Sequence, residues 1–323
     1  MTGEPSTVGR ERAVANRDQL PVAAVVVNYN AGRALVDCVR SLEREGVAEV
    51  IVVDNASSDR SLGDLAADPA ASLASRVVRS GRNLGYGGAA NLGAGESSAR
   101  YILVSNPDLV ITDGAVSTLV DRLDSDASLA VAGPMIRDLD GDVYPSGRAF
   151  PSLRDAVGHA FVGLVWGGNP WTRRYRHLGA DQHRGRPADW VSGSCFLVRR
   201  VAFESVGGFD ESFFMYVEDV DLCWRLRRAG WGVFYEPRAE VVHEQGRSTS
   251  QHPYRMLASH HRALWRFARR TAHGPERALL PLMAAGLGAR LVLAWADHFL
   301  RPVREAVLPT AKVRHRARGE LQP

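Results

Sequence analysis

The chain has 323 residues, of which 45% are hydrophobic and 24% charged, and its formal net charge at pH 7 is +4. This length can bury a full hydrophobic core, so it predicts a globular protein with one large domain, alone or with an appendage. The three cysteines, Cys38, Cys195 and Cys223, are odd in number and widely spaced. This spacing argues against a disulfide framework or a cysteine zinc site and favours reduced thiols in a cytoplasmic protein.

The first part of the chain predicts a parallel α/β unit. Residues 1–20 are polar, carry charges of both signs and predict a flexible tail without a signal peptide. Continuous apolar runs at 21–27 and 49–53 are typical of strands buried on both faces of a parallel sheet. Apolar residues at helical spacing predict a helix at 33–45 between them. In such a unit, ligands bind at the carboxyl ends of the strands.

Polar residues occupy both of these strand ends. The first strand ends in Asn28-Tyr29-Asn30, and the second ends in Asp54. Residues 57–59 are predicted to cap the next helix, and residues 76–79 to form a third strand.

A glycine-rich segment, residues 82–93, follows the third strand. Such a turn into a helix lets backbone N–H groups approach an anion, but it is equally typical of tight packing. The segment has neither the GxGxxG spacing of a dinucleotide-binding fold nor the lysine and hydroxyl residue of a P-loop, so neither site is supported.

The fourth predicted strand, 101–104, runs directly into Asn106-Pro107-Asp108. A carboxylate in a proline-stiffened turn can bind a divalent cation that carries a diphosphate, and the alternative is an Asx turn. A strand at 130–136 and a hairpin turn at Asp140-Gly141 follow. Residues 144–189 show no clear period and are interpreted as an inserted loop region that shapes a substrate site, although its arginines are equally compatible with a solvated surface.

Residues 213–221 set three carboxylates, Glu218, Asp219 and Asp221, into an apolar and aromatic segment. Such carboxylates are costly to bury unless they are paired, hydrogen-bonded or close to a metal, and an apolar pocket raises the pKa of a carboxyl group toward the range of a general base. The alternative is the exposed face of a helix, with Asp221 and Arg225 as an i,i+4 pair.

Regular elements are also predicted on both sides of this acidic stretch. Strands are expected at 190–198 and 231–235, and a short helix at 201–206. His243 is expected in a polar loop after the last strand, where a single histidine is usually structural.

The basicity of the chain is confined to its C-terminal region. Residues 255–323 hold 13 Lys/Arg against 4 Asp/Glu, a net charge of +9 that leaves −5 on the preceding residues. The apolar stretch 278–300 is interrupted by Arg290 and Asp297, so it suits helices in the interface of an anionic membrane better than a membrane span. The alternative is a helical pair packed on the domain with its arginines outward. No nucleic-acid-binding motif is present.

Six short motifs, taken in order, resemble the inverting glycosyltransferases of family 2. They are NYN at 28–30, VDNASSD at 53–59, RNLGYGGAAN at 82–91, NPD at 106–108, GGFDESFFMYVEDVDLCWR at 207–225 and VVHEQGRS at 241–248. Within the family, the segments at 133–148, 169–176 and 190–200 resemble actinobacterial transferases that build the cell-wall linker with L-rhamnose.

The resemblance implies a GT-A fold, with a nucleotide-binding, mostly parallel sheet in residues 21–254 and a basic helical appendage in residues 255–323. The positions that match the nucleotide-sugar wall of the family are Asn28, Tyr29, Asn30, Asp54, Asn83, Gly85, Asn91 and Asn106. Asp108 matches the last acid of the DXD motif, and Asn106 replaces the first acid of that motif. His243 matches a metal-ligand position. Asp219 matches the general base, and Glu218 either orients the acceptor or supports the helix.

The resemblance also implies a reaction and its partners. L-rhamnose would pass from dTDP-L-rhamnose to a polyprenyl-diphosphate-linked GlcNAc at the cytoplasmic face of an anionic membrane, with Mg²⁺ or Mn²⁺ as the cofactor. The acceptor hydroxyl would attack the anomeric carbon opposite the leaving dTDP while Asp219 takes its proton. The alternatives are a family 2 transferase with another sugar nucleotide or acceptor, and a binding module without turnover.

Overall fold

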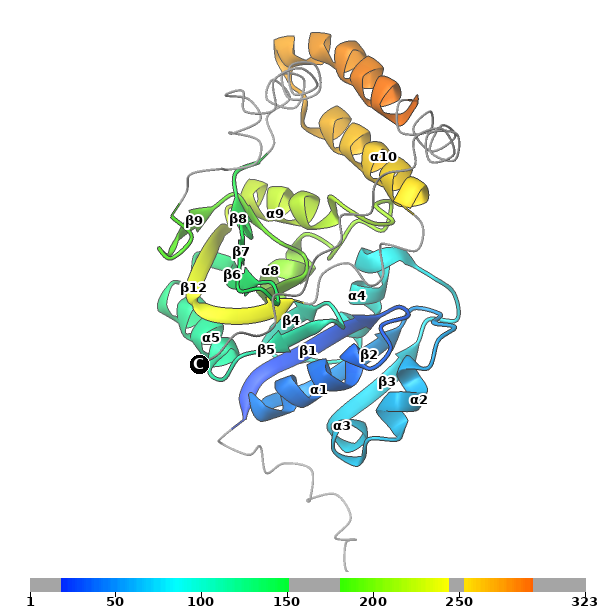
Figure 1. The fold of residues 1–323 in the computed structure, drawn as a ribbon. Coiled ribbons are helices and arrows are strands. Elements are labelled where there is room, and N and C mark those ends of the chain that lie inside the picture. The colour runs from blue at the N-terminus through cyan, green and yellow to red at the C-terminus, as the bar shows by residue number, and fades with distance from the viewer. Residues whose placement is uncertain (1–18, 151–180, 244–252, 293–323) are drawn as a thin grey trace, which may run out of the picture.

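The computed structural model describes residues 19–150, 181–243 and 253–292 (Figure 1). The predicted N-terminal tail, most of the inserted loop region and the end of the basic tail lie outside the described residues. The helices are α1 Ala34–Arg44, α2 Ser61–Ala66, α3 Pro69–Ala74, α4 Gly85–Gly95, α5 Ala115–Ser125, α8 Arg200–Ser205, α9 Glu218–Arg228 and α10 Pro253–Thr271, followed by a 3-10 helix, η2 Gly274–Leu279. Residues 280–292 are also helical.

Most strands join one mixed sheet in the order β3-β2-β1-β4-β11-β6-β12-β5, with β7 beside β6 and β9 beside β12. The strands are β1 Leu20–Asn28, β2 Val47–Asp54, β3 Ser75–Arg79, β4 Tyr101–Ser105, β5 Leu109–Ile111, β6 Leu129–Arg137, β7 Val143–Tyr144, β8 Gly147–Arg148, β9 Arg186–Ala188, β10 Trp190–Val191, β11 Cys195–Arg199 and β12 Gly232–His243. The first four strands in chain order are parallel, β11 is antiparallel to both its neighbours, and β6 and β12 are parallel.

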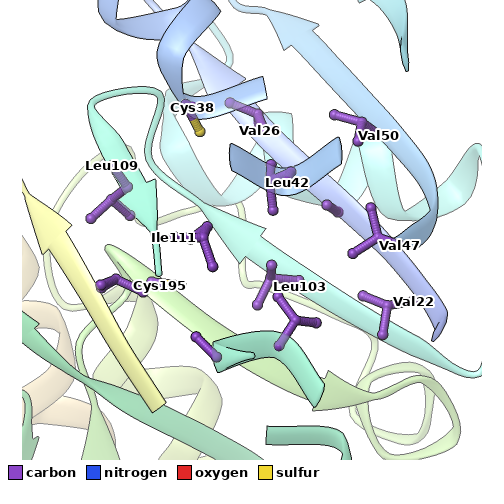
Figure 2. Close-up of a cluster of buried hydrophobic side chains, with 14 of the residues drawn as sticks. Val22, Val26, Cys38, Leu42, Val47, Val50, Leu103, Leu109, Ile111 and Cys195 are labelled. Atoms are coloured by element: carbon purple, nitrogen blue, oxygen red, sulfur yellow. The ribbon is translucent and has the colours of Figure 1, made fainter. Parts of the chain in front are cut away.

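The core lies on both faces of this sheet, as the unbroken apolar run of β1 predicts. Val22, Ala24 and Val26 point into the layer covered by α1 and α5, which Figure 2 shows in close-up. Ala23 and Val25 point into the opposite layer, beneath α4, α8 and α9. All five are fully buried. Since burying a valine side chain contributes roughly 1.5–3 kcal/mol, this double-sided burial holds β1 at the centre of the sheet.

The parallel register brings the predicted polar residues to one edge. Asn28 pairs with Asp54 across β1 and β2, and Ser105 at the end of β4 pairs with Val26 of β1. The polar strand ends therefore meet at the carboxyl edge of the sheet, as the βαβ pattern predicts. The hairpin prediction is also confirmed, because β6 and β7 are antiparallel and Gly141 between them has φ +86°.

The cap predicted at residues 57–59 comes from Asp59, whose Oδ1 accepts at 3.1 Å from the N–H of Ser61, the first residue of α2; the N-cap residue Arg60 itself makes no side-chain cap. Two local predictions are wrong. The single strand expected at 190–198 is two strands in different sheets, because the chain breaks between β10 and β11. His243 is the last residue of the long strand β12 and does not lie in a loop.

The C-terminal helices pack beyond α9, away from the sheet (Figure 1). Ala263 and Phe267 of α10 are buried against Phe213, Val217 and Val220. Met283 of the next helix is buried with residues of α10, so the two helices form a pair. Among residues 19–150, 181–243 and 253–292, no helix has the length and apolarity needed to span a bilayer.

Candidate active site

The carboxyl ends of β1 and β2, with the loops that follow them, form one wall of the candidate site. A buried asparagine, Asn28, organises this wall. The Asn28 side chain is fully buried, and its amide N–H₂ group donates to Asp54 Oδ1 at 3.0 Å, Ser61 Oγ at 2.9 Å and Ser57 Oγ at 3.1 Å. Its Oδ1 atom is buried with no hydrogen-bond partner. Asn28 therefore fixes the Asp54 carboxylate at the strand end.

Asn30 fastens the following loop to this wall. It adopts a left-handed conformation, φ +53°, and its Oδ1 accepts from the N–H groups of Ser58 at 2.8 Å and Asp59 at 3.3 Å. Its own N–H donates to Ser57 Oγ at 3.1 Å. Residues 57–59 thus bind the strand end, and Asp59 also accepts from the N–H of Ser61 at the start of α2. Tyr29 is 37% exposed beside this loop, so its ring is open to a ligand.

Asn55, which the sequence did not single out, links the two parts of the wall. Its buried amide donates to Asn83 Oδ1 and to the carbonyl oxygen of Gly85, both at 3.1 Å, and its Oδ1 accepts from the Leu84 N–H at 2.8 Å. Asn83 Oδ1 also accepts from the Gly85 N–H at 2.9 Å. Because these bonds use both ends of Asn55, the start of α4 is held beside the end of β2.

Asn91 lies apart from this wall. Its amide donates to the Phe209 carbonyl oxygen at 2.9 Å and accepts from the Phe209 N–H at 2.9 Å, and it also donates to Glu211 at 3.3 Å. The side chain therefore holds the turn that precedes the acidic stretch. This turn requires glycine at position 208, where φ is +69°. A Cβ atom there would lie only 2.6 Å from Asn91 Oδ1.

The start of α4 is also joined to the loop that carries the acidic pair. The Tyr86 N–H donates to the Phe214 carbonyl oxygen at 3.0 Å, and the Tyr86 hydroxyl donates to the Gly193 carbonyl oxygen at 2.6 Å. Burial, followed by the charge of Glu218, raises the pKa of Tyr86 well above its ordinary value of 10, so the hydroxyl keeps its proton. Gly85 has φ +79°, and a Cβ there would lie 2.2 Å from the same Phe214 oxygen.

Gly85→Ala is therefore expected to destabilise the protein by about 3 kcal/mol or more, since it adds a backbone clash to the cost of a left-handed conformation. Thermal melts of the purified variant measure the loss. Gly46→Ala is the matched control, because Gly46 has φ +67° and nothing within 4 Å of its added Cβ. The control should lose only about 1 kcal/mol. Equal losses in the two variants would contradict the close packing of Gly85 on Phe214.

Asp108 and His243, the two residues matched to metal-ligand positions, meet at the end of β12. The Nε2 atom of His243 lies 3.0 Å from Asp108 Oδ1 and 3.4 Å from the amide nitrogen of Asn106, and Asp108 is 8% exposed. The register explains the meeting, because His243 pairs with Leu109 across β12 and β5. A carboxylate and an imidazole fit Mn²⁺ or Mg²⁺.

These residues would hold only part of a coordination shell. Within the described segments, no group of three or more His, Cys, Asp or Glu side chains could enclose an ion. A cation between Asp108 and His243 would therefore need oxygens from a bound diphosphate and from water. Such a shell is typical of Mg²⁺ and Mn²⁺ sites that act on phosphate esters.

Glu218 and Asp219 begin α9, and Asp219 is held by backbone on both sides. Its Oδ2 accepts from the Gly193 N–H at 2.7 Å and its Oδ1 from the Val220 N–H at 2.8 Å. Gly193 lies in the break between β10 and β11, and a Cβ there would come within 3.1 Å of Asp219. The break that the sequence did not predict therefore gives the carboxylate its partner.

The alternative of an exposed helix face is wrong. Glu218 is 6% exposed and Asp221 is fully buried. The predicted pair of Asp221 with Arg225 is present at 2.7 Å, but Arg270 of α10 also contacts this carboxylate. The acidic residues are thus enclosed between α9, α10 and the sheet.

The surroundings of Glu218 and Asp219 affect the pKa values of these two neighbouring carboxyl groups differently. Burial and the charge of Asp219 raise the pKa of Glu218 to about 8, and one oxygen of Glu218 is buried with no partner. Burial also raises the pKa of Asp219, but the N–H groups of Gly193 and Val220 and the charge of Arg148 oppose that rise. The two N–H donors and the nearby guanidinium favour the charged form of Asp219, which a general base requires, whereas one oxygen of Glu218 has no donor to stabilise a charge.

Glu218→Gln is expected to raise the melting temperature, by an amount that grows with pH. Between the ordinary glutamate pKa and about 8, the unfolded chain ionises at this residue and the folded protein does not, so unfolding becomes easier as pH rises. Glutamine removes this difference. At pH 8 the gain should be at least about 1 kcal/mol and near zero at pH 4.

Melting curves from pH 4 to 8 test this prediction. Glu204→Gln is the control, since the Glu204 side chain is 60% exposed and pairs with Arg200 on a helix surface. A gain for Glu218→Gln that stays constant with pH, or that Glu204→Gln reproduces, would contradict a protonated Glu218.

The backbone before Glu218 is strained. Tyr216 and Val217 are consecutive non-glycine residues with φ +69° and +68°. Each left-handed residue costs roughly 1–2 kcal/mol, and more when it is β-branched. The ring of His260 packs edge-on against Tyr216 at 5.3 Å, and Ser259 donates to the Met215 carbonyl oxygen at 3.4 Å. Residues of α10 therefore hold the turn that places the acidic pair.

An aromatic and cationic cluster, missed in the sequence, stands near Asp219. The guanidinium of Arg148 lies over the rings of Tyr144 at 4.7 Å and Trp190 at 5.2 Å. Arg148 and Trp190 face each other across the two-stranded sheet of β8 and β10. No local pattern in the sequence could predict these contacts, because the partners are far apart in the chain. The indole N–H of Trp190, for example, donates to the carbonyl oxygen of Ala149, 41 residues away.

Comparisons with known proteins agree with this fold. The family model described as Glycosyl transferase family 2 matches residues 23–207, and the model described as Glycosyl transferase family group 2 matches residues 171–305. N-acetylglucosaminyl-diphospho-decaprenol L-rhamnosyltransferase of Mycobacterium tuberculosis is 41% identical over 267 residues, which cover 77% of this chain and 84% of that protein.

Two solved structures resemble the fold at low sequence identity. A mannosyltransferase from Pyrobaculum calidifontis, in complex with GDP-Man and Mn²⁺, has a TM-score of 0.54 and 16% identity over 90% of this chain and 82% of that chain. GalNAc-T7 with UDP, GalNAc and Mn²⁺ has a TM-score of 0.53 and 18% identity over 70% of this chain and 43% of that chain. They confirm the predicted α/β fold of the GT-A type.

Proposed function

The chain belongs to glycosyl transferase family 2, and we propose that it transfers L-rhamnose from dTDP-L-rhamnose to N-acetylglucosaminyl-diphospho-polyprenol in cell-wall linker synthesis. The mycobacterial relative supports this choice of sugar and acceptor, because its 41% identity extends over 77% of the chain. The observation that carries the chemistry is the placement of Asp219, a carboxyl group held by two backbone N–H groups at the start of α9.

In this proposal the donor lies along the carboxyl edge of the sheet. Tyr29 and Asp54 would face the nucleoside, and Asn83 and the N-terminal turn of α4 would face the diphosphate. Asp108 and His243 would hold Mg²⁺ or Mn²⁺, and a cation bound there would neutralise the charge that grows on the departing diphosphate. Asp219 would take the proton of the acceptor hydroxyl as that oxygen attacks the anomeric carbon, which inverts the configuration.

A donor screen with purified full-length protein tests the function. The acceptor is N-acetylglucosaminyl-diphospho-polyprenol in detergent, and the donors are dTDP-L-rhamnose, UDP and GDP sugars with Mg²⁺ or Mn²⁺. The proposal requires rhamnosyl product from dTDP-L-rhamnose at a rate well above that of every other donor. Preference for another donor would identify a different family 2 transferase, and nucleotide binding without product would identify a binding module.

We also propose that the C-terminal helices place the enzyme on the inner face of the membrane. Residues 280–292 expose apolar side chains, with Leu282 at 49% and Val292 at 68% exposure. The net charge of +9 on residues 255–323 would add attraction to anionic lipids, about 1 kcal/mol for each basic residue near the surface. Buried apolar area and charge together are the usual basis of interfacial helix binding.

Leu282→Ser with Val292→Ser is expected to reduce binding to anionic vesicles by roughly tenfold, since two exposed apolar side chains would no longer enter the interface. Vesicle co-sedimentation measures the effect, and unchanged melting temperature shows that the fold is intact. Leu73→Ser is the control, because Leu73 is 90% exposed on α3 in the nucleotide-binding half. Full sedimentation of the double variant would remove these helices from membrane binding.

A further inference from the structure

A pocket on α10 is lined almost entirely by arginine. It has a volume of about 420 Å³, and its lining residues are Arg262, Trp265, Arg266, Arg269 and Arg270. Their spacing along the helix is that of one helical face. We call this feature the arginine pocket. Four guanidinium groups on one face repel one another, and anions that bind between them would reduce this repulsion.

Two of these arginines are already paired. Arg270 contacts Asp221 and donates to Asp210 Oδ2 at 2.5 Å, and Arg266 donates to the Ser212 carbonyl oxygen. The salt bridge to Arg270 contributes to holding the pKa of Asp210 at about 2, so this pair stays ionised. These bonds fix one side of the arginine pocket to the loop and helix that carry Asp219.

The other two arginines have no partner in the parts of the chain that the structure describes. Arg262 and Arg269 are exposed, and neither takes part in an ion pair or hydrogen bond there. They therefore supply two uncompensated charges beside two fixed ones. Guanidinium groups bind phosphate oxygens in a bidentate manner, and the volume of the pocket is sufficient for two linked phosphates.

We propose that the arginine pocket binds the diphosphate of the lipid-linked acceptor. This inference rests on the proposed function. The position supports it, because Arg270 binds Asp221, which lies two residues after Asp219 in the first turn of α9. If the pocket bound only the headgroups of membrane lipids, it would not need to be bonded to α9, the helix that carries Asp219. The acceptor, in contrast, must present its sugar hydroxyl to Asp219 while its diphosphate is held nearby.

Arg262→Gln with Arg269→Gln tests the proposal without breaking a bond seen in the fold. The matched control is Arg277→Gln with Arg290→Gln, two exposed arginines of the same C-terminal region that do not line the pocket. Both double variants lose two charges, so general attraction to anionic vesicles should fall equally. Binding of inorganic pyrophosphate in the presence of a chelator is measured by calorimetry, and KM is measured for donor and lipid-linked acceptor.

The pocket variant should lose at least roughly tenfold in pyrophosphate affinity and gain a similar factor in acceptor KM, with donor KM unchanged. The control should keep both values. Equal pyrophosphate binding by the pocket variant and the native protein would overturn the proposal, and so would equal changes in the two double variants. A loss confined to vesicle binding would assign these arginines to membrane headgroups and also overturn it.

The proposed function and the assignment of the arginine pocket can be disproved independently. If the native protein transfers no rhamnose to any diphosphate-linked acceptor, the proposed function fails, and the acceptor assignment of the pocket falls with it. Pyrophosphate binding that is lost only in the pocket variant would still establish a diphosphate site on α10. If transfer occurs but acceptor KM is the same in both double variants, only the pocket assignment is wrong.

Discussion

Asp219→Asn is expected to lower the rate of transfer at saturating substrates by about 10³-fold, within the range that general-base catalysis contributes. Asparagine keeps the size of the side chain and can still accept the Gly193 N–H, but it cannot take a proton from the acceptor hydroxyl. Donor affinity should stay within about threefold, because in the proposed arrangement Asp219 acts on the acceptor and does not bind the nucleotide.

Product formation under single-turnover conditions measures the loss, and calorimetry with dTDP-L-rhamnose measures donor binding. Glu218→Gln is the informative comparison, since Glu218 is already protonated near neutral pH and its amide should retain most of the rate. If Asp219→Asn turns over near the native rate, Asp219 is not the base. Loss of donor binding in step with the rate would indicate a structural role.

Removal of divalent cations is expected to abolish transfer, and Asp108→Ala and His243→Ala should each weaken metal-dependent donor binding by roughly 10- to 100-fold. The effect should be large because Asn106 stands where the usual motif has an acid, so that in the proposed site Asp108 and His243 would be the two strong protein ligands. Their side chains lie 3.0 Å apart, so the loss of either one leaves the cation with a single protein ligand.

Donor titrations with and without Mn²⁺ separate metal-dependent from metal-independent binding. Asp113→Ala is the control, because Asp113 is 88% exposed and forms a long, 3.8 Å ion pair with Arg44 at the surface. Its donor affinity should match that of the native protein. Full activity in excess chelator, or equal donor affinity of His243→Ala with and without Mn²⁺, would contradict a metal at this site.

The elements with continuous apolar runs were the ones that the sequence predicted well. The continuous run of valine and alanine in β1 predicts a strand buried on both faces, which the structure confirms. The polar residue that ends the run marks the end of the strand. The same reasoning placed Asp54 and Asp108 at one edge of the sheet, because parallel strands end on the same side. Asp108 and His243 could be brought together only through the family resemblance.

The contacts that complete the site come from backbone breaks and distant pairs. Gly193 reaches Asp219 only because the chain bends between two strands, and local propensity gave a single strand there. Asn55 and Tyr86 bond to atoms 28 and 107 residues away. No short-range period encodes such bonds, so they emerge only when the sheet order and the loop conformations are known.

The left-handed pair Tyr216 and Val217 has a consequence for the order of events during synthesis of the chain. Its contacts come from α10, where Ser259 follows Met215 by 44 residues, and Phe267 comes later still. Until that helix has left the ribosome, the turn lacks the contacts with α10 that help to offset its backbone strain. The strands and helices that precede this turn can therefore form on the nascent chain before α10 has been made. The position of Asp219 is fixed last, when α10 packs against the turn.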